Sequence, residues 1–148
     1  MNHAEKARDL FREGYNCAQS VVGAFHEEMG LSLSEATRLA SSFGGGMGGL
    51  RETCGAVTGM FLVAGMLMGY DDPADYDGKR LIMPVSASWL SSFARSMTRW
   101  SVGNCCDPLP EKLQKDPQPR TEQYYKVRPC VRFVETAAEL LDEMLQEQ

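Results

Sequence analysis

The chain has 148 residues, which fits a single domain with a hydrophobic core of its own. Hydrophobic residues make up 43% and charged residues 24%, the balance of an ordinary globular protein. The net charge is −5 and Lys and Arg form no cluster, so we expect no nucleic-acid partner. The charged N-terminus lacks the apolar core of a secretory signal, which predicts a cytoplasmic protein with reduced thiols.

The first part of the chain predicts short helices. Apolar residues recur there at steps of three and four, the period of an α-helix. After a first helix that stops near residue 14, Asn16 and Gln19 have the spacing of a capping box, so a second helix should begin at Cys17. Ser32 and Glu35 predict the start of a third helix in the same way.

A glycine-rich stretch, residues 43–59, contains Cys54 in the run Glu-Thr-Cys-Gly-Ala-Val-Thr-Gly. Thr53 is expected to be the N-cap of a fourth helix, with Cys54 as the first helical residue. Unpaired N–H groups and the positive end of the helix dipole lie there, and such positions lower the pKa of a thiol. We therefore expect sulfur chemistry at this position.

The fourth helix, from about residue 53 to 69, is apolar on all sides. Its uncharged run is at the short limit for a membrane span and is flanked by charges, so we expect a buried core helix and no membrane insertion. Its glycines are spaced four apart, which would let neighbouring backbones approach closely. A fifth helix should run from about residue 79 to 100, with Pro84 in its first turn, at a later start or at a kink.

The remainder predicts a proline-rich connector over residues 107–128 and a last helix from about Pro129. No β-alternation of useful length appears in the sequence. We therefore expect an all-α fold, a compact bundle of about five to seven helices, in a single domain over residues 1–148.

Five cysteines are spread along the chain without a Cys-x-x-Cys motif, which weighs against zinc ribbons and thioredoxin-type sites. Short connections make consecutive helices antiparallel, and this alternation predicts that the cysteines gather at one end of the bundle. Three of them should lie near helix N-termini. Plain burial of each thiol is the alternative, because free cysteine is often a core residue. The residues concerned are Cys17, Cys54, Cys105, Cys106 and Cys130.

The pattern of Cys17, the glycine run and Cys54-Gly55-Ala56-Val57-Thr58-Gly59 resembles a bacterial and archaeal family of redox-active proteins. That family is named for its cysteine signature, C-GCAxxG-C-C, and the resemblance extends from residue 16 to about 141. It implies that Cys17, Cys54, Cys106 and Cys130 are the four shared cysteines and that Cys105 is additional.

Three functions stay open at this point. In the first, the chain carries out thiol–disulfide or electron-transfer chemistry, with Cys54 as the attacking thiolate, activated by its helix terminus and by Arg51. Cys17 would resolve the intermediate, and Cys106 and Cys130 would be a second pair or a support. In the second, the same four sulfurs bind zinc or an iron–sulfur cluster. In the third, the protein is a structural or interaction module without cysteine chemistry.

Other sites are not indicated. Gly44, Gly46 and Gly49 match G-x-G-x-x-G, but a helix precedes them where a dinucleotide site needs a strand, so no nucleotide is expected. A tight turn with close packing is the favoured role of these glycines, and an anion or thiolate at the helix start after Arg51 is the alternative. The redox partner is not identifiable, and a homo-oligomer is left open.

Overall fold

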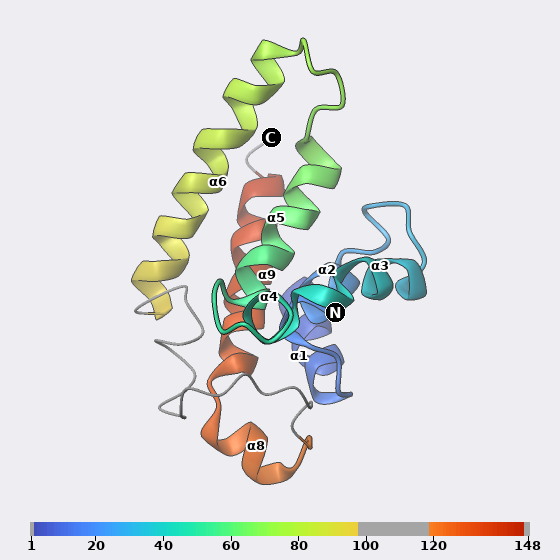
Figure 1. Cartoon of the computed structure of the whole chain (residues 1–148), viewed down its shortest axis with the longest axis vertical. Coiled ribbons are helices and arrows are strands. Elements are labelled where there is room, and N and C mark those ends of the chain that lie inside the picture. Colours follow the sequence, from blue (N-terminus) through green and yellow to red (C-terminus); the bar gives the residue numbers. More distant parts are fainter. Residues whose placement is uncertain (1, 98–118, 147–148) are drawn as a thin grey trace.

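A computed structural model describes residues 2–97 and 119–146, and all regular secondary structure in these residues is helical (Figure 1). The all-α prediction is confirmed. The described part of the chain has eight α-helices, more than expected, because the short α4 and α8 form where a turn and a connector are predicted. The elements are α1 (His3–Arg12), α2 (Cys17–Ala24), α3 (Leu33–Ala40), the 3-10 turn η1 (Ser41–Phe43), α4 (Gly44–Met47), α5 (Gly55–Met68), α6 (Tyr76–Met97), α8 (Glu122–Val127) and α9 (Cys130–Gln146).

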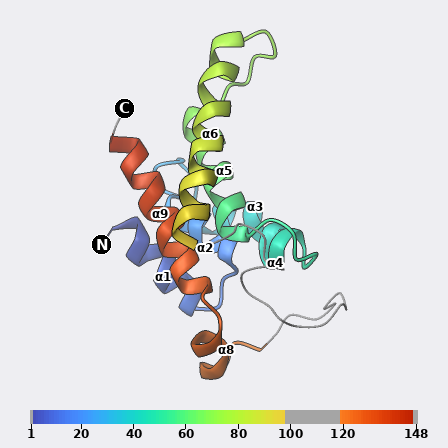
Figure 2. The same cartoon turned by 90° about the vertical axis from the view of Figure 1, so that its left-hand side faces the viewer.

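The core lies among α1, α2, α5 and α9, which are far apart in sequence but packed together (Figures 1 and 2). α9 packs along α1, and α2 lies between α1 and α5. His3 on α1 hydrogen-bonds to Asp142 on α9 and stacks on Phe25. The largest fully buried side chains are Phe11, Phe25, Phe93, Met60 and Leu141.

The helix starts follow the capping signals. Asn16 with Gln19 and Ser32 with Glu35 both form complete capping boxes, as predicted. The start of α5 differs by one residue from the expectation, because Cys54, and not Thr53, is the N-cap, and it makes no side-chain cap hydrogen bond.

Two other expectations need correction. Residues 122–127 form α8 within the segment expected to be an extended connector, where Thr121 accepts a hydrogen bond from the N–H of Tyr124 and so caps a helix. The rest of that connector, residues 107–118, lies outside the described residues. α6 begins at Tyr76 and runs through position 84, so Pro84 lies neither in the first turn nor at a later start.

The close packing of α2 against α5 depends on two glycines of α5. A Cβ atom built on Gly59 would lie 2.9 Å from the Cβ atom of Val21, and one on Gly55 would lie 3.0 Å from the backbone nitrogen of Ala18. Real Cβ atoms almost never show the first distance, and the second is tighter than nine in ten real Cβ contacts. Gly65, which the sequence spacing grouped with them, has no atom of the described residues within 4 Å of such a Cβ, so an added methyl group there would meet open space.

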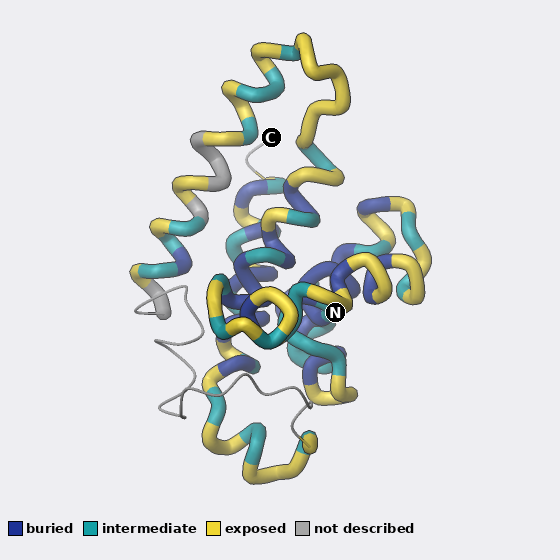
Figure 3. The backbone as a smooth tube through the Cα atoms, viewed as in Figure 1, coloured by how far each residue is buried: buried dark blue, intermediate teal, exposed yellow. Residues whose placement is uncertain are grey.

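The second half of α5 and the first half of α6 form a hairpin that extends beyond the rest of the bundle (Figures 1 and 3). Met66 on α5 is 54% exposed and Phe61 is 37% exposed. The expectation of a fully buried fourth helix is therefore wrong for this half. Among the described helices, none combines the length and the apolar character that crossing a bilayer requires.

The glycine packing gives a stability prediction. Gly59→Ala should lower the free energy of unfolding by about 1–3 kcal/mol, because the new methyl group overpacks the contact with α2. Gly65→Ala in the same helix is the matched control and should raise it by about 0.5–1 kcal/mol, since it restricts the unfolded chain and meets no neighbour. Urea unfolding followed by circular dichroism measures both, and equal effects would contradict this account of α5.

Candidate functional site

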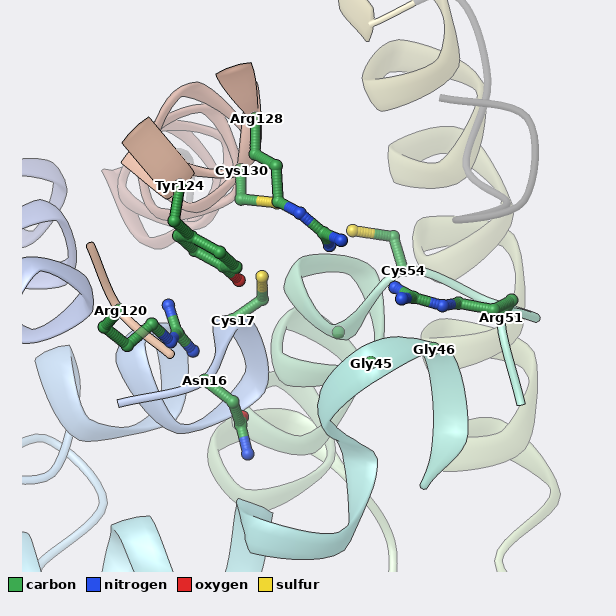
Figure 4. Close-up of a pocket in the computed structure, with 11 residues that line it drawn as sticks. Asn16, Cys17, Gly45, Gly46, Arg51, Cys54, Arg120, Tyr124, Arg128 and Cys130 are labelled. Atoms are coloured by element: carbon green, nitrogen blue, oxygen red, sulfur yellow. The ribbon is translucent and has the colours of Figure 1, made fainter. Parts of the chain in front are cut away.

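Three helix N-termini meet at one pocket, and each presents a cysteine to it (Figure 4). Cys17 is the first residue of α2, Cys54 is the N-cap of α5, and Cys130 is the first residue of α9. The pocket has a volume of about 50 Å³. Cys54 and Cys130 are buried and Cys17 is partly exposed. The structure thus brings three of the four expected cysteines together, while Cys105 and Cys106 lie outside the described residues.

The capping box of α2 holds Cys17 in place. The Asn16 side chain accepts a hydrogen bond of 2.9 Å from the N–H of Gln19, and the Gln19 side chain accepts one of 3.1 Å from the N–H of Asn16. The Asn16 amide also donates to the carbonyl of Ser41 at 3.1 Å. These contacts join the start of α2 to the segment that leads into the glycine loop.

The glycine loop then brings Arg51 and Cys54 to the same place. Gly45 and Gly46 have positive φ angles and line the pocket. Their carbonyls accept hydrogen bonds from the N–H groups of Arg51 (3.2 Å) and Glu52 (3.0 Å), which folds the loop back on itself. Left-handed backbone of this kind favours glycine, and this explains the composition of the segment in conformational terms.

The third side of the pocket comes from the segment around α8. The guanidinium of Arg120 lies over the rings of Phe11 and Tyr124, 4.7 Å from the centre of each. Arg128 lies 5.0 Å from the Tyr124 ring. Arg120 also donates a hydrogen bond of 3.3 Å to the carbonyl of Tyr15. These stacked contacts direct two guanidinium groups toward the thiols (Figure 4).

Sequence reasoning identified Arg51 but missed Arg120, Tyr124 and Arg128. The available signal was the alternation of arginine and tyrosine just before Cys130, in the run Arg-Thr-Glu-Gln-Tyr-Tyr-Lys-Val-Arg-Pro-Cys. Arginine stacks on aromatic rings, so this composition was compatible with a folded segment and not only with an extended connector.

The thiols influence one another directly. A side-chain hydrogen bond to Cys130 raises the pKa of Cys17 well above its ordinary value of 9.0, and burial and the nearby sulfurs of Cys130 and Cys54 raise it further. The positive charge of Arg120 lowers the pKa of Cys17. Cys17 therefore keeps its proton and can donate it to the sulfur of Cys130. A helix N-terminus alone would have favoured the thiolate, but at Cys17 the neighbouring sulfur and burial prevail.

The described residues contain no ready metal site. Within residues 2–97 and 119–146, no group of three or more His, Cys, Asp or Glu side chains has an arrangement that could hold a metal ion. Cys17, Cys54 and Cys130 share the pocket but are thus not arranged as three ligands of one metal ion, and Cys106 lies outside the described residues.

Comparison with known proteins identifies the family of the chain. The family model described as "Putative redox-active protein (C_GCAxxG_C_C)" matches residues 15–144. The chain belongs to this family. An uncharacterized protein of Archaeoglobus fulgidus is 29% identical over 157 aligned positions, covering 100% of this chain and 99% of that protein. No solved structure matches the chain. The family match includes all three cysteines of the pocket and its three arginines.

The raised pKa of Cys17 predicts a pH dependence. Alkylation of Cys17 by iodoacetamide, followed by peptide mass spectrometry, should have its pH midpoint above 9.0 in the folded protein and lower in the urea-unfolded chain. Because the unfolded chain loses this proton first, the free energy of unfolding should fall as the pH rises past the ordinary thiol value. Cys17→Ser should make that fall shallower. Equal midpoints in the folded and unfolded chains would contradict the prediction.

Proposed function

We propose that the protein is a thiol–disulfide oxidoreductase or electron-transfer protein in which Cys17 and Cys130 are the reacting pair. The observation that supports this most is that Cys17 and Cys130 line one pocket together with Cys54, and that the Cys130 side chain is the largest cause of the raised pKa of Cys17. Two thiols that influence each other in this way lie close together, as the two halves of a disulfide must.

The proposed reaction transfers two electrons to an external disulfide, RSSR. The Cys130 thiolate attacks one sulfur of RSSR, forming the mixed disulfide Cys130–S–S–R and releasing RS⁻, which takes up a proton. The Cys17 thiolate then attacks the Cys130 sulfur, forming the Cys17–Cys130 disulfide and releasing the second RS⁻. The protein dithiol is oxidised and RSSR is reduced to two RSH molecules.

Cys17 suits the resolving step because its proton is retained until the mixed disulfide has formed. The Cys17 thiol donates its proton to the Cys130 sulfur and so supports the charge there before attack. The sequence-based roles, with Cys54 attacking, Cys17 resolving and Cys106 with Cys130 in support, stay a prediction. A cytoplasmic location would keep these thiols reduced, and it too stays a prediction.

Metal binding is the second candidate from the sequence: Cys17, Cys54 and Cys130 line one pocket, although the described residues have no three ligands arranged to hold a metal ion. Zinc and iron–sulfur sites use four cysteine ligands, so Cys17, Cys54 and Cys130 would need Cys106 as a fourth. The cationic lining would offset the negative charge of such a thiolate cluster. The two candidates differ in whether stoichiometric metal accompanies the reduced protein.

The test is disulfide mapping after mild oxidation. The anaerobically purified, metal-analysed protein is treated with a slight excess of hydroxyethyl disulfide, digested and analysed by mass spectrometry without reduction. We expect a Cys17–Cys130 peptide in the wild type and in Cys54→Ser, and its loss in Cys17→Ser and Cys130→Ser.

Other outcomes would support the alternatives. A Cys17–Cys54 peptide that disappears in Cys54→Ser would favour the sequence-based pairing. Stoichiometric zinc or iron, lost in each cysteine variant, would favour the metal-binding function. Unmodified thiols with no metal would overturn both proposals.

A further inference from the structure

We propose that the pocket binds a small anionic group beside its thiols, with Arg120 as the main binding residue. The preferred oxidants would then be disulfides that carry a carboxylate or another oxyanion near the sulfurs. This inference deepens the proposed function, and it rests on that function for its reaction. The binding of the anion itself is argued from the lining of the pocket.

The lining of the pocket is cationic although the chain as a whole is acidic. Arg51, Arg120 and Arg128 line it, and no Asp or Glu occurs among its described lining residues. The net charge of the chain is −5, so three guanidinium groups around one small pocket are a strong local exception. A concave cationic site attracts small anions and repels cations, even on a chain whose net charge is negative.

Arg120 has unused hydrogen-bonding capacity inside this pocket. Its Nη1 atom is buried, yet it has no hydrogen-bond partner within residues 2–97 and 119–146. A buried, unsatisfied donor is unfavourable, more so on a charged group. The same guanidinium is held by the rings of Phe11 and Tyr124 and by the carbonyl of Tyr15. An oxyanion beside Nη1 would supply the missing acceptor without rearranging the arginine.

The backbone adds to the positive potential. The N-termini of α2, α5 and α9 meet at the pocket, and none of these helices has an acidic residue in its first turn. Each N-terminus contributes a partial positive charge and attracts anions. Arg51 is held at a φ of 61°, a left-handed conformation that is unfavourable for a residue with a Cβ atom. Strain of this kind is often associated with functional sites, and here it places a third guanidinium in the lining.

The size of the pocket limits what can enter. A volume of about 50 Å³ accommodates a few water molecules or one small charged group. A nucleotide or a folded peptide segment would not fit inside, whereas the carboxylate end of a short disulfide would. The charged end would bind at Arg120, and the disulfide bond would lie toward Cys130 for the attack described above.

A charge series of short disulfides tests the inference. Dithiodipropionate is anionic, hydroxyethyl disulfide is neutral and cystamine is cationic, and the three are similar in size. Their rates of oxidising the reduced protein, each divided by its rate with dithiothreitol, should fall in that order. We expect a difference of about tenfold or more between the two ends of the series, as charged hydrogen bonds usually give.

Arginine variants test whether Arg120 causes the preference for anionic disulfides. Arg120→Gln should remove most of the preference for dithiodipropionate over hydroxyethyl disulfide, so that their normalised rates become nearly equal, and Arg120→Lys should retain part of that preference. Arg38→Gln, an exposed arginine on α3 away from the pocket, makes the same change of net charge and should leave the preference unchanged. Thermal unfolding checks that each variant is folded. If Arg120→Gln does not fold, Arg128→Gln replaces it and should likewise reduce the preference for dithiodipropionate.

Sulfate distinguishes a free anion from the charged end of a disulfide. At equal ionic strength, sulfate should slow the reaction with dithiodipropionate more than chloride does and leave the neutral disulfide unaffected. Equal normalised rates for the three disulfides would overturn the anion site while leaving the thiol function intact. If none of the three disulfides oxidises the protein, the proposed function itself fails. The anion site alone would then be supported if sulfate stabilises the wild type, but not Arg120→Gln, against heat.

Discussion

The arrangement of the site depends on the close contact between α2 and α5. A Cβ atom on Gly55 would lie 3.2 Å from the Cβ atom of Cys17, so the residue that follows Cys54 touches the other cysteine directly. Gly59, one turn further along α5, lies against Val21 of α2 in the same way. The glycines of the Cys-Gly-Ala-Val-Thr-Gly motif therefore explain how two sulfurs distant in sequence come to share one pocket. The glycines of the motif allow α2 and α5 to pack closely, and this packing brings the two helix starts, with their cysteines, together.

The all-α fold, and the meeting of three of the four candidate cysteines at one pocket, could be predicted because the relevant signals are local. The capping pair Asn16 and Gln19 marked the start of α2, and the antiparallel alternation of helices predicted that Cys17 and Cys54 share an end. The position of Arg120 could not be predicted in the same way, since it stacks on Phe11 of α1, far away in the sequence; the local run of arginines around Tyr124 indicated only a folded segment. Contacts between residues a hundred positions apart leave no periodic signal in a single sequence.

The electrostatics of the pocket combine two opposing influences. Guanidinium groups and helix N-termini favour negative charge, while burial and neighbouring sulfurs disfavour a thiolate at Cys17. Cys17 holds its proton and so does not neutralise a guanidinium group, and Arg120 keeps an unsatisfied donor among the described residues. The unsatisfied Nη1 donor of Arg120 is therefore available to a bound anion. This links the protonation of one cysteine to the capacity of the pocket for a charged ligand.

The position of Cys17 and Cys130 at helix starts also couples their oxidation to the stability of the fold. A disulfide between them would close a loop of about 110 residues, and in the chain-entropy model such a crosslink stabilises the folded state by about 5 kcal/mol. α2 and α9 already pack together in the core, so the crosslink would constrain the unfolded chain far more than the folded one. By thermodynamic linkage, whatever stabilises the folded disulfide makes the dithiol a stronger reductant. The same packing that gathers the sulfurs would therefore favour electron donation by this pair.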